Sequence, residues 1–190
     1  LIRRETVENR WVAMDPFFFP GAALDNMPNF QQGMMSAISR FAIEMSDQIG
    51  RVRGSSQVDE DLDKAVGFLK YKGDVWTFNL KESIWPTRSS SEQYRHGMQA
   101  FTRYNKRLAE GNAVFDRRAD NLLATLERFT ADIGSASAVL DNSVRELSAL
   151  SLSADDVFYN TKGRLYAYYM LMRELRVDFA PVIGEKKLDA

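Results

Sequence analysis

The sequence contains no cysteine, a single histidine and only five prolines among its 190 residues. Without cysteine there can be no disulfide, no thiolate nucleophile and no zinc site built on sulfur. One histidine cannot build a metal site of several histidines, and a Ser–His–Asp triad would have to centre on it. His96 lies off the apolar stripe of its predicted helix, so we expect an exposed surface residue there.

The chain also lacks an excess of charge of either sign and a long apolar run. Its 25 Lys and Arg residues face 26 Asp and Glu residues, so no global field attracts nucleic acid or an anionic membrane. No run of about 18 apolar residues occurs, so no part of this sequence is expected to span a bilayer. A glycine-rich phosphate loop and a dinucleotide fingerprint are both missing. We therefore predict no nucleic-acid partner, no cofactor and no resident metal.

The composition supports one globular domain. Hydrophobic residues make up 45% of the chain and charged residues 27%. A domain of this length buries about 70% of the surface that its unfolded chain exposes, so it can fold without disulfides or a structural metal ion. Apolar residues recur three and four positions apart along most of the sequence, as in amphipathic helices. We predict an all-α fold, an elongated bundle of about five to six helices in a single domain over residues 1–190.

The first part of the chain is predicted to be helical with an apolar loop. Residues 1–28 hold a helix from Ile2 to about Met14 and then the loop, because three prolines interrupt the helical pattern. Residues 29–72 hold two helices, the first capped by Asn29. The second begins with an acidic run at residues 59–63, which suits the positive end of a helix dipole. The buried stripe of the first of these two helices is predicted to be Met34, Ile38, Phe41, Met45, Ile49 and Val52.

The acidic run has a second interpretation, a calcium loop. That interpretation fits poorly, because the sixth position counted from Asp59 is Lys64, where an EF hand requires glycine.

Residues 73–88 form the least helical region, and a short strand or hairpin is possible over residues 73–86. Residues 89–180 are predicted to form three helices, the first of which opens with a capping box from Ser89 to Glu92. The basic residues Arg103 and Arg107 of that helix have acidic neighbours in the sequence and are expected to form a solvated face.

The clearest helical pattern lies between residues 113 and 149. A continuous helix over that range would be about 55 Å long, whereas a compact domain of this size is only about 40 Å across. We expect an elongated bundle with a mild bend at Gly134, which Ser135 and Ser137 flank. The predicted stripe is Phe115, Ala119, Leu122, Leu126, Phe129, Ile133, Ala136 and Leu140, extended by Val144 and Leu147.

The last predicted helix begins near Ser153 and ends at Pro181, before a polar tail over residues 181–190. Its tyrosines are expected to pack in the core, with hydrogen-bonded hydroxyl groups. The apolar residues of this helix are Phe158, Leu165, Tyr168, Tyr169, Met172 and Leu175.

Five aromatic residues make up the candidate interaction surface. Phe17, Phe18 and Phe19 follow one another between two prolines. If buried they would close one end of the bundle, and if exposed they would bind a partner or the membrane interface. Trp76 and Trp85 lie in the irregular region, where a groove can form because helical regularity is lost.

Several short motifs resemble those of a bacterial family catalogued as domain of unknown function 2333. They are residues 15–21 (DPFFFPG), 24–33 (LDNMPNFQQG), 90–97 (SSEQYRHG) and 118–122 (RADNL), in that order along the chain. A structural role is sufficient for the second motif, because its side chains can cap a turn and the following helix. The residues of that motif are Leu24, Asp25, Asn26, Pro28 and Asn29.

The resemblance implies a location but no activity. Members of this family look like Gram-negative inner-membrane proteins with one N-terminal spanning helix and a periplasmic helical domain. We therefore expect the periplasmic face of the inner membrane, although the sequence alone also allows the cytoplasm. Since the chain begins at Leu1 rather than Met, contact with the membrane is expected only through an upstream segment absent from this chain.

Three hypotheses for function follow. The first is a non-catalytic, membrane-tethered interaction or scaffold module that binds protein partners or associates with itself. The second is a small-molecule or lipid-binding domain with a pocket beside Trp76, Trp85 and the Phe17–Phe19 segment. The third is a cell-wall hydrolase, which needs two carboxylates at the right separation.

Overall fold

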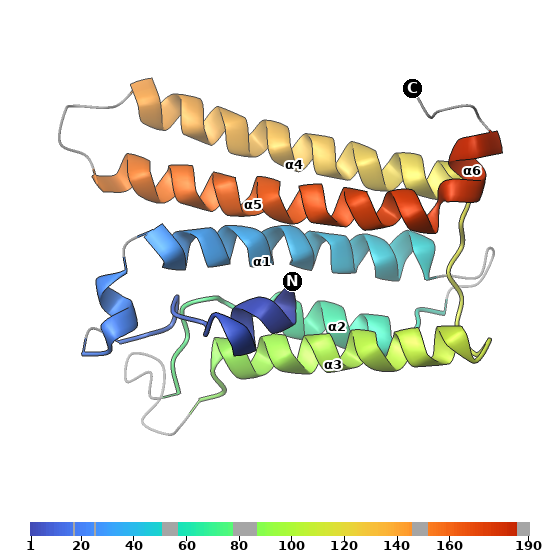
Figure 1. The fold of residues 1–190 in the computed structure, drawn as a ribbon, viewed down its shortest axis with the longest axis horizontal. Helices are drawn as coiled ribbons and strands as arrows, with labels where there is room; N and C mark the ends of the chain where they lie inside the picture. Colours follow the sequence, from blue (N-terminus) through green and yellow to red (C-terminus); the bar gives the residue numbers. More distant parts are fainter. Residues whose placement is uncertain (17, 25, 51–56, 78–86, 146–151, 186–190) are drawn as a thin grey trace.

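In a computed structural model of the chain, five longer helices account for most of the structure. Figure 1 shows α4 (Ala119–Arg145), α5 (Leu152–Asp178) and α1 (Asn26–Glu44) side by side, with α2 (Glu60–Leu69) and α3 (Ser90–Ala109) beyond α1. The predicted all-α bundle is confirmed, and no strand occurs among the residues that the structure describes. The described residues are 1–16, 18–24, 26–50, 57–77, 87–145 and 152–185.

The centre of the bundle is the contact between α1 and α5, which two glycines make possible. A Cβ atom on Gly33 would lie 1.9 Å from the carbonyl oxygen of Asn160. A Cβ atom on Gly163 would lie 2.0 Å from the carbonyl oxygen of Phe30. The two helix backbones therefore touch, and any side chain at either position would push them apart.

Helix α1 starts at Asn26, three residues before the predicted cap at Asn29. The earlier start is possible because Pro28 lies in the first turn, where a helix needs no donor from the proline nitrogen. The helix passes into one π turn, η3 (Met45–Ile49). The predicted stripe of α1 and η3 is confirmed, with Phe41 half-buried and Val52 outside the described residues; its buried members are Met34, Ile38, Met45 and Ile49.

The N-terminal helix is shorter than predicted. It ends in one π turn, η1 (Arg4–Glu8). Arg10 then adopts a positive φ of 59°, which is incompatible with a right-handed helix. The side chain of Gln31 holds this turn, because it accepts a hydrogen bond from the Val12 N–H (2.9 Å) and donates one to the Arg10 carbonyl (2.9 Å). The predicted helix to Met14 is therefore wrong, since a buried glutamine from α1 replaces the helical hydrogen bonds.

Helix α4 begins at Ala119, six residues later than the pattern predicted. The preceding segment bonds to other elements instead, because the Val114 carbonyl accepts from Tyr104 and the Asp116 N–H donates to the Ile49 carbonyl (2.8 Å). With 27 residues α4 is about 40 Å long, which matches a compact domain. The helix runs unbroken through Gly134.

Helices α2 and α3 are held together by charged side chains. Ser89 caps α3 as predicted, and Asp59 caps α2 at the acidic run where that helix was predicted to begin. Arg103 donates to Asp61 (2.8 Å), and Arg107 donates to Asp59 (2.7 Å) and Asp61 (3.0 Å). The solvated face predicted for Arg103 and Arg107 is partly correct, because Arg103 is exposed and Arg107 half-buried, but both residues also bridge to α2.

The two ends of the segment between α2 and α3 are hydrogen-bonded to each other. The N–H of Thr87 donates to the carbonyl of Thr77 (2.7 Å), and the Ser90 N–H donates to the Val75 carbonyl (2.9 Å). Residues 73–77 form no strand, and residues 78–86 of the predicted hairpin lie outside the described residues.

Helix α5 ends at Asp178, and the short helix α6 (Ala180–Glu185) follows with Pro181 in its first turn. None of the described helices is both long enough and apolar enough to cross a membrane.

Candidate functional site

The outward side of α5 carries large apolar side chains that the chain leaves uncovered. Tyr168 and Leu175 are buried. Tyr169, which was predicted to pack in the core, is instead 60% exposed. Periodicity could not show this, because α5 mixes apolar and polar residues around its circumference and so has no single apolar stripe. The exposed fractions of the other three are Phe158 47%, Leu165 44% and Met172 38%.

The buried Asp132 fixes how α4 sits on α5. Its carboxylate accepts hydrogen bonds from the hydroxyl of Tyr168 (2.8 Å) and from Arg164 (3.3 Å), both on α5. The Arg40 guanidinium of α1 forms an ion pair with the same carboxylate, with a 2.6 Å N–O distance. Burial, and then the hydrogen bond to Asp132, raise the pKa of Tyr168, so its hydroxyl keeps its proton and donates at neutral pH.

The Asp132 cluster also shows which residues face outward. Moving one residue toward the C-terminus of a helix turns the side-chain direction by about 100°. Because the two helices of an antiparallel pair run in opposite directions, this step leads to the same side of the pair on both helices. Ile133 follows Asp132, and Leu165 follows Arg164, so Ile133 and Leu165 both lie on the side away from the Arg40 ion pair.

Residues seven apart repeat this position at three levels along the pair. Because Asp132 meets both Arg164 and Tyr168, it lies level with the residue midway between them, and the antiparallel register places residue 126 level with 172, 133 level with 165, and 140 level with 158. We call this surface the outer face of the α4–α5 hairpin. Its members are Leu126, Ile133 and Leu140, which are half-buried, and Phe158, Leu165, Tyr169 and Met172, which are exposed.

Exposed apolar side chains are concentrated on these two helices. Of the twelve large hydrophobic residues that are exposed in the described part of the chain, eight lie on α4 or α5. Four of these eight, Phe158, Leu165, Tyr169 and Met172, belong to the outer face, and large apolar side chains exposed together on a small domain usually mark a binding surface.

The predicted aromatic surface is brought together in part. The rings of Phe18 and Phe19 lie 5.7 and 6.0 Å from the ring of Trp76, and the guanidinium of Arg10 lies 5.3 Å from the Phe19 ring. Phe18 is 60% exposed, whereas Phe19 and Trp76 are half-buried. Phe17 and Trp85 lie outside the described residues.

The family-like motif lies where α1 begins. Leu24 is exposed, Asn26 and Pro28 form the first turn of α1, and Asp25 lies outside the described residues. The side chain of Asn29 donates to Asp156 of α5 (2.6 Å) rather than capping a helix. In this structure Asn29 therefore ties α1 to the beginning of α5.

A groove of about 810 Å³ lies between α1, α3 and α5. Its floor is apolar, with Phe41, Met98, Phe101 and Leu171 among the lining residues. Its charged lining residues are Arg3, Arg117, Arg173, Glu174 and Asp178. The predicted pocket beside Trp76 is not this groove, because Trp76 does not line it.

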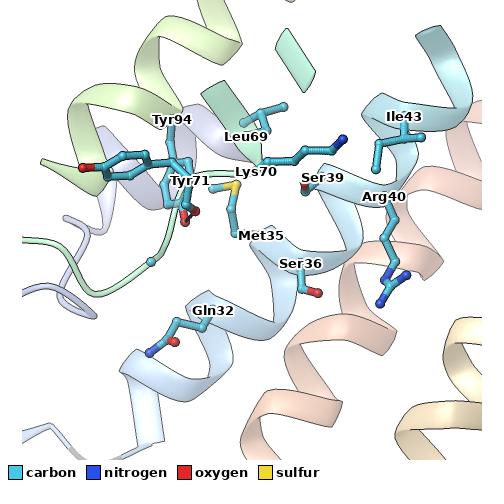
Figure 2. Close-up of a pocket in the computed structure, with 11 residues that line it drawn as sticks. Gln32, Met35, Ser36, Ser39, Arg40, Ile43, Leu69, Lys70, Tyr71 and Tyr94 are labelled. Atoms are coloured by element: carbon cyan, nitrogen blue, oxygen red, sulfur yellow. Dashed lines mark hydrogen bonds between the residues drawn. The ribbon is translucent and has the colours of Figure 1, made fainter. Parts of the chain in front are cut away.

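A second cavity, of about 360 Å³, lies on α1 beside the end of α2. Figure 2 shows Lys70 lying across α1 near Ser39, whereas the Arg40 guanidinium points away from Lys70. Tyr94 also lines this cavity, and its hydroxyl donates to the Tyr71 carbonyl (2.9 Å). Burial raises the pKa of Tyr94, so this phenol cannot act as a base at neutral pH.

Carboxylates meet at two cavity walls. Glu44 and Asp47 line a cavity of about 260 Å³, and Glu174 and Asp178 line the groove. Burial, and then the charge of Asp47, raise the pKa of Glu44, although Arg128 lies 3.4 Å away and opposes the shift. These pairs are the only feature along the cavities described above that matches the carboxylate-hydrolase hypothesis.

The remaining ligand-type side chains are dispersed. His96 is half-buried with its ring 5.3 Å from the ring of Phe68, so the expected exposed position is only partly correct. Within the described ranges, no three His, Asp or Glu side chains gather closely enough to hold a metal ion.

Comparison with known proteins returns one family. The model of the family described as "uncharacterized protein conserved in bacteria (DUF2333)" matches residues 10–152, which leaves almost all of α5 outside the match. Neither a search of curated proteins nor a search of solved structures finds a match to this chain.

Proposed function

Since the chain belongs to the DUF2333 family, which carries no assigned activity, we propose a function from its surface: a protein-interaction module that binds through the outer face of the α4–α5 hairpin. One observation carries the proposal. Helix α5 has large apolar side chains on more than one side, yet α1 and α4 cover only some of them and leave Phe158, Leu165, Tyr169 and Met172 exposed. Large apolar side chains exposed together on one side of a small domain usually mark a binding surface.

The surface suits a helical partner. Its apolar residues repeat every seven positions on both helices, which is the spacing that interlocks with the side chains of other helices. The two helices are each about 40 Å long and about 10 Å wide, so this whole side of the hairpin offers about 800 Å², of which the three apolar levels cover about half. A stable interface of ordinary size takes about 800 Å² from each partner, so it would include the polar ends of this side as well.

The proposal includes a location on the periplasmic face of the inner membrane, with the domain held there by an upstream segment. The resemblance of the sequence motifs to membrane-anchored bacterial proteins supports it. A reporter-enzyme fusion to the full-length protein, active only after export, tests it. Activity of a reporter that works only in the cytoplasm would contradict it.

The binding role is tested on the full-length protein in its native cells. We expect it to migrate on a native gel as a complex larger than one chain, and Leu165→Asp to reduce the complex to a single chain, because a charge would be buried in the interface. Val7→Asp is the matched control, since Val7 is similarly exposed at 55% but lies on η1, away from this face. Complexes of unchanged size in both variants would contradict the proposal.

A second function, the binding of an apolar ligand with an anionic head, is favoured by the groove between α1, α3 and α5. A volume of about 810 Å³ is typical of ligand sites, and its apolar floor meets three guanidinium groups against two carboxylates at the edge. A fluorescent long-chain fatty acid is the probe. We expect saturable binding that Met98→Trp weakens by about tenfold or more, a loss of about 1.4 kcal/mol.

The control for the groove is Leu123→Trp, which adds the same bulk at an exposed site on α4 that does not line it. Equal binding by both variants would contradict a ligand in the groove.

A further inference from the structure

We infer that the helical partner of the outer face is a second copy of this chain, so that two α4–α5 hairpins form a four-helix bundle about a two-fold axis. The inference rests on the proposed function and names its partner. It is carried by the area of the face, by its symmetry and by the charges along its two edges.

The face is symmetric about its middle level. Leu126 with Met172, Ile133 with Leu165, and Leu140 with Phe158 form three apolar levels spaced by two helical turns, as set by the contacts of Asp132 with Arg164 and Tyr168. Rotation about an axis parallel to the helices lays α4 of one copy over α5 of the other and keeps each level in place. A second copy therefore presents large side chains wherever the first does, as a two-fold interface requires.

The two edges of the face carry opposite charge. Glu127 and Asp141 each follow an outer-face residue by one position, which turns them to the free edge of α4. Arg173 follows Met172 in the same way on α5, and Lys162 lies between Phe158 and Leu165. All four are exposed, and Arg173 forms an ion pair with the neighbouring exposed Glu174 of its own chain.

The charges select one of two possible arrangements. With α4 over α5 of the second copy, Glu127 comes level with Arg173, and Asp141 comes within about one or two turns of Lys162. With α4 over α4, acidic edges would instead meet acidic edges, which disfavours that pairing. We therefore assign the arrangement with the axis parallel to the helices.

The oligomeric state of the purified chain is the first test. We expect light scattering to show the mass rising with concentration from one chain of 21.7 kDa to two. Leu165→Asp should raise the dissociation constant by about 30-fold or more, as for a residue at the centre of an interface. Val7→Asp should leave it unchanged, and both variants should unfold at the wild-type temperature.

The arrangement is tested by cross-linking, which is simple because the chain has no cysteine of its own. A mixture of Glu127→Cys and Arg173→Cys chains should form a disulfide-linked dimer, whereas neither variant alone should do so. Cross-linking of Glu127→Cys together with Asp141→Cys, but not with Arg173→Cys, would overturn the arrangement in favour of α4 over α4.

A purified chain that stays monomeric at every concentration would overturn the second copy as partner. The proposed function would still stand if the native complex of the full-length protein remained sensitive to Leu165→Asp. If the native complex were also insensitive to Leu165→Asp, both the second copy as partner and the proposed function would be contradicted.

Discussion

Two glycines on the long helices have opposite surroundings, and their substitution should have opposite effects. Gly163 meets the α1 backbone, whereas Gly134 lies exposed on α4 with no atom within 4 Å of an added Cβ. Gly134→Ala should stabilise the fold by about 0.5–1 kcal/mol, because alanine favours a helix interior. Gly163→Ala should destabilise it by about 1–3 kcal/mol through overpacking.

Urea unfolding of both glycine variants measures this difference. Equal effects of the two substitutions would mean that α1 and α5 are not in backbone contact.

Tyr104 should make the fold sensitive to alkaline pH. Its hydroxyl donates to the Val114 carbonyl, and burial raises its pKa from 10.0 to about 12. The unfolded chain loses this proton near pH 10 while the folded chain keeps it. The contribution of Tyr104 is therefore complete below about pH 10 and is lost as the pH rises through about 12.

The free energy of unfolding, measured from neutral to alkaline pH, should fall less steeply in Tyr104→Phe than in the wild type. Tyr94 and Tyr168 have raised pKa values for the same first reason, burial, so some alkaline loss should remain in the variant. Identical slopes would show that Tyr104 titrates normally.

At the scale of helices, the α2–α3 contact depends on an ionised carboxylate. Burial works against the charge of Asp61, but the hydrogen bonds from Arg103 and Arg107 outweigh it and lower its pKa below 3.8. Its stabilising contribution is therefore present above about pH 3.8 and is lost as the pH falls through the lowered pKa.

Asp61→Asn should cost about 1.5–3 kcal/mol at neutral pH, the range for hydrogen bonds to charged groups. The difference in the free energy of unfolding between Asp61→Asn and the wild type should become smaller at acidic pH. Asp63→Asn is the matched control, because Asp63 is in the same turn of α2 but exposed. The urea midpoint of each variant as a function of pH measures this, and a constant difference down to strong acid would rule out the ionised Asp61.

Elements whose signals are local could be predicted from the sequence. The caps Asp59 and Ser89 and the stripe of α1 depend on residues within a few positions of one another, and the structure contains them. The beginning of α4 depends on hydrogen bonds to Tyr104 and Ile49, which are distant in sequence. No local pattern contains that information, so the helix was predicted six residues too long at its start.

The candidate site was predicted less well for a related reason. Periodicity finds apolar stripes but cannot say which stripe another element covers, and α5 has more than one. The one available signal was that the apolar residues of α5 do not fall on a single stripe, which indicates a helix with contacts on more than one side. Asp132 gave no signal, because its partners Arg40 and Tyr168 come from two other helices.

At the scale of the whole molecule, the folded unit extends beyond the family match. The match ends at residue 152, yet α1 buries its face against α5 over residues 152–178. A chain ending at residue 151 should therefore lack a cooperative unfolding transition, because the core of α1 would be exposed to water.

Near-ultraviolet circular dichroism and thermal unfolding of the chain ending at residue 151 measure this. The full chain with Leu165→Asp is the control, since it alters the outer face of α5 while keeping the helix. A cooperative transition near the wild-type temperature in the shortened chain would show that α5 is an appendage rather than part of the core.

Helix α5 presents Leu171 to the groove and Tyr169 to the outer face, so one rigid rod forms a wall of both surfaces. Its backbone contact with α1 at Gly33 and Gly163 leaves it little freedom to shift on one side alone. Thermodynamic reciprocity then applies to the two surfaces. A groove ligand that displaces α5 must change the affinity of the outer face for its partner, and the partner must change the affinity for the ligand by the same factor.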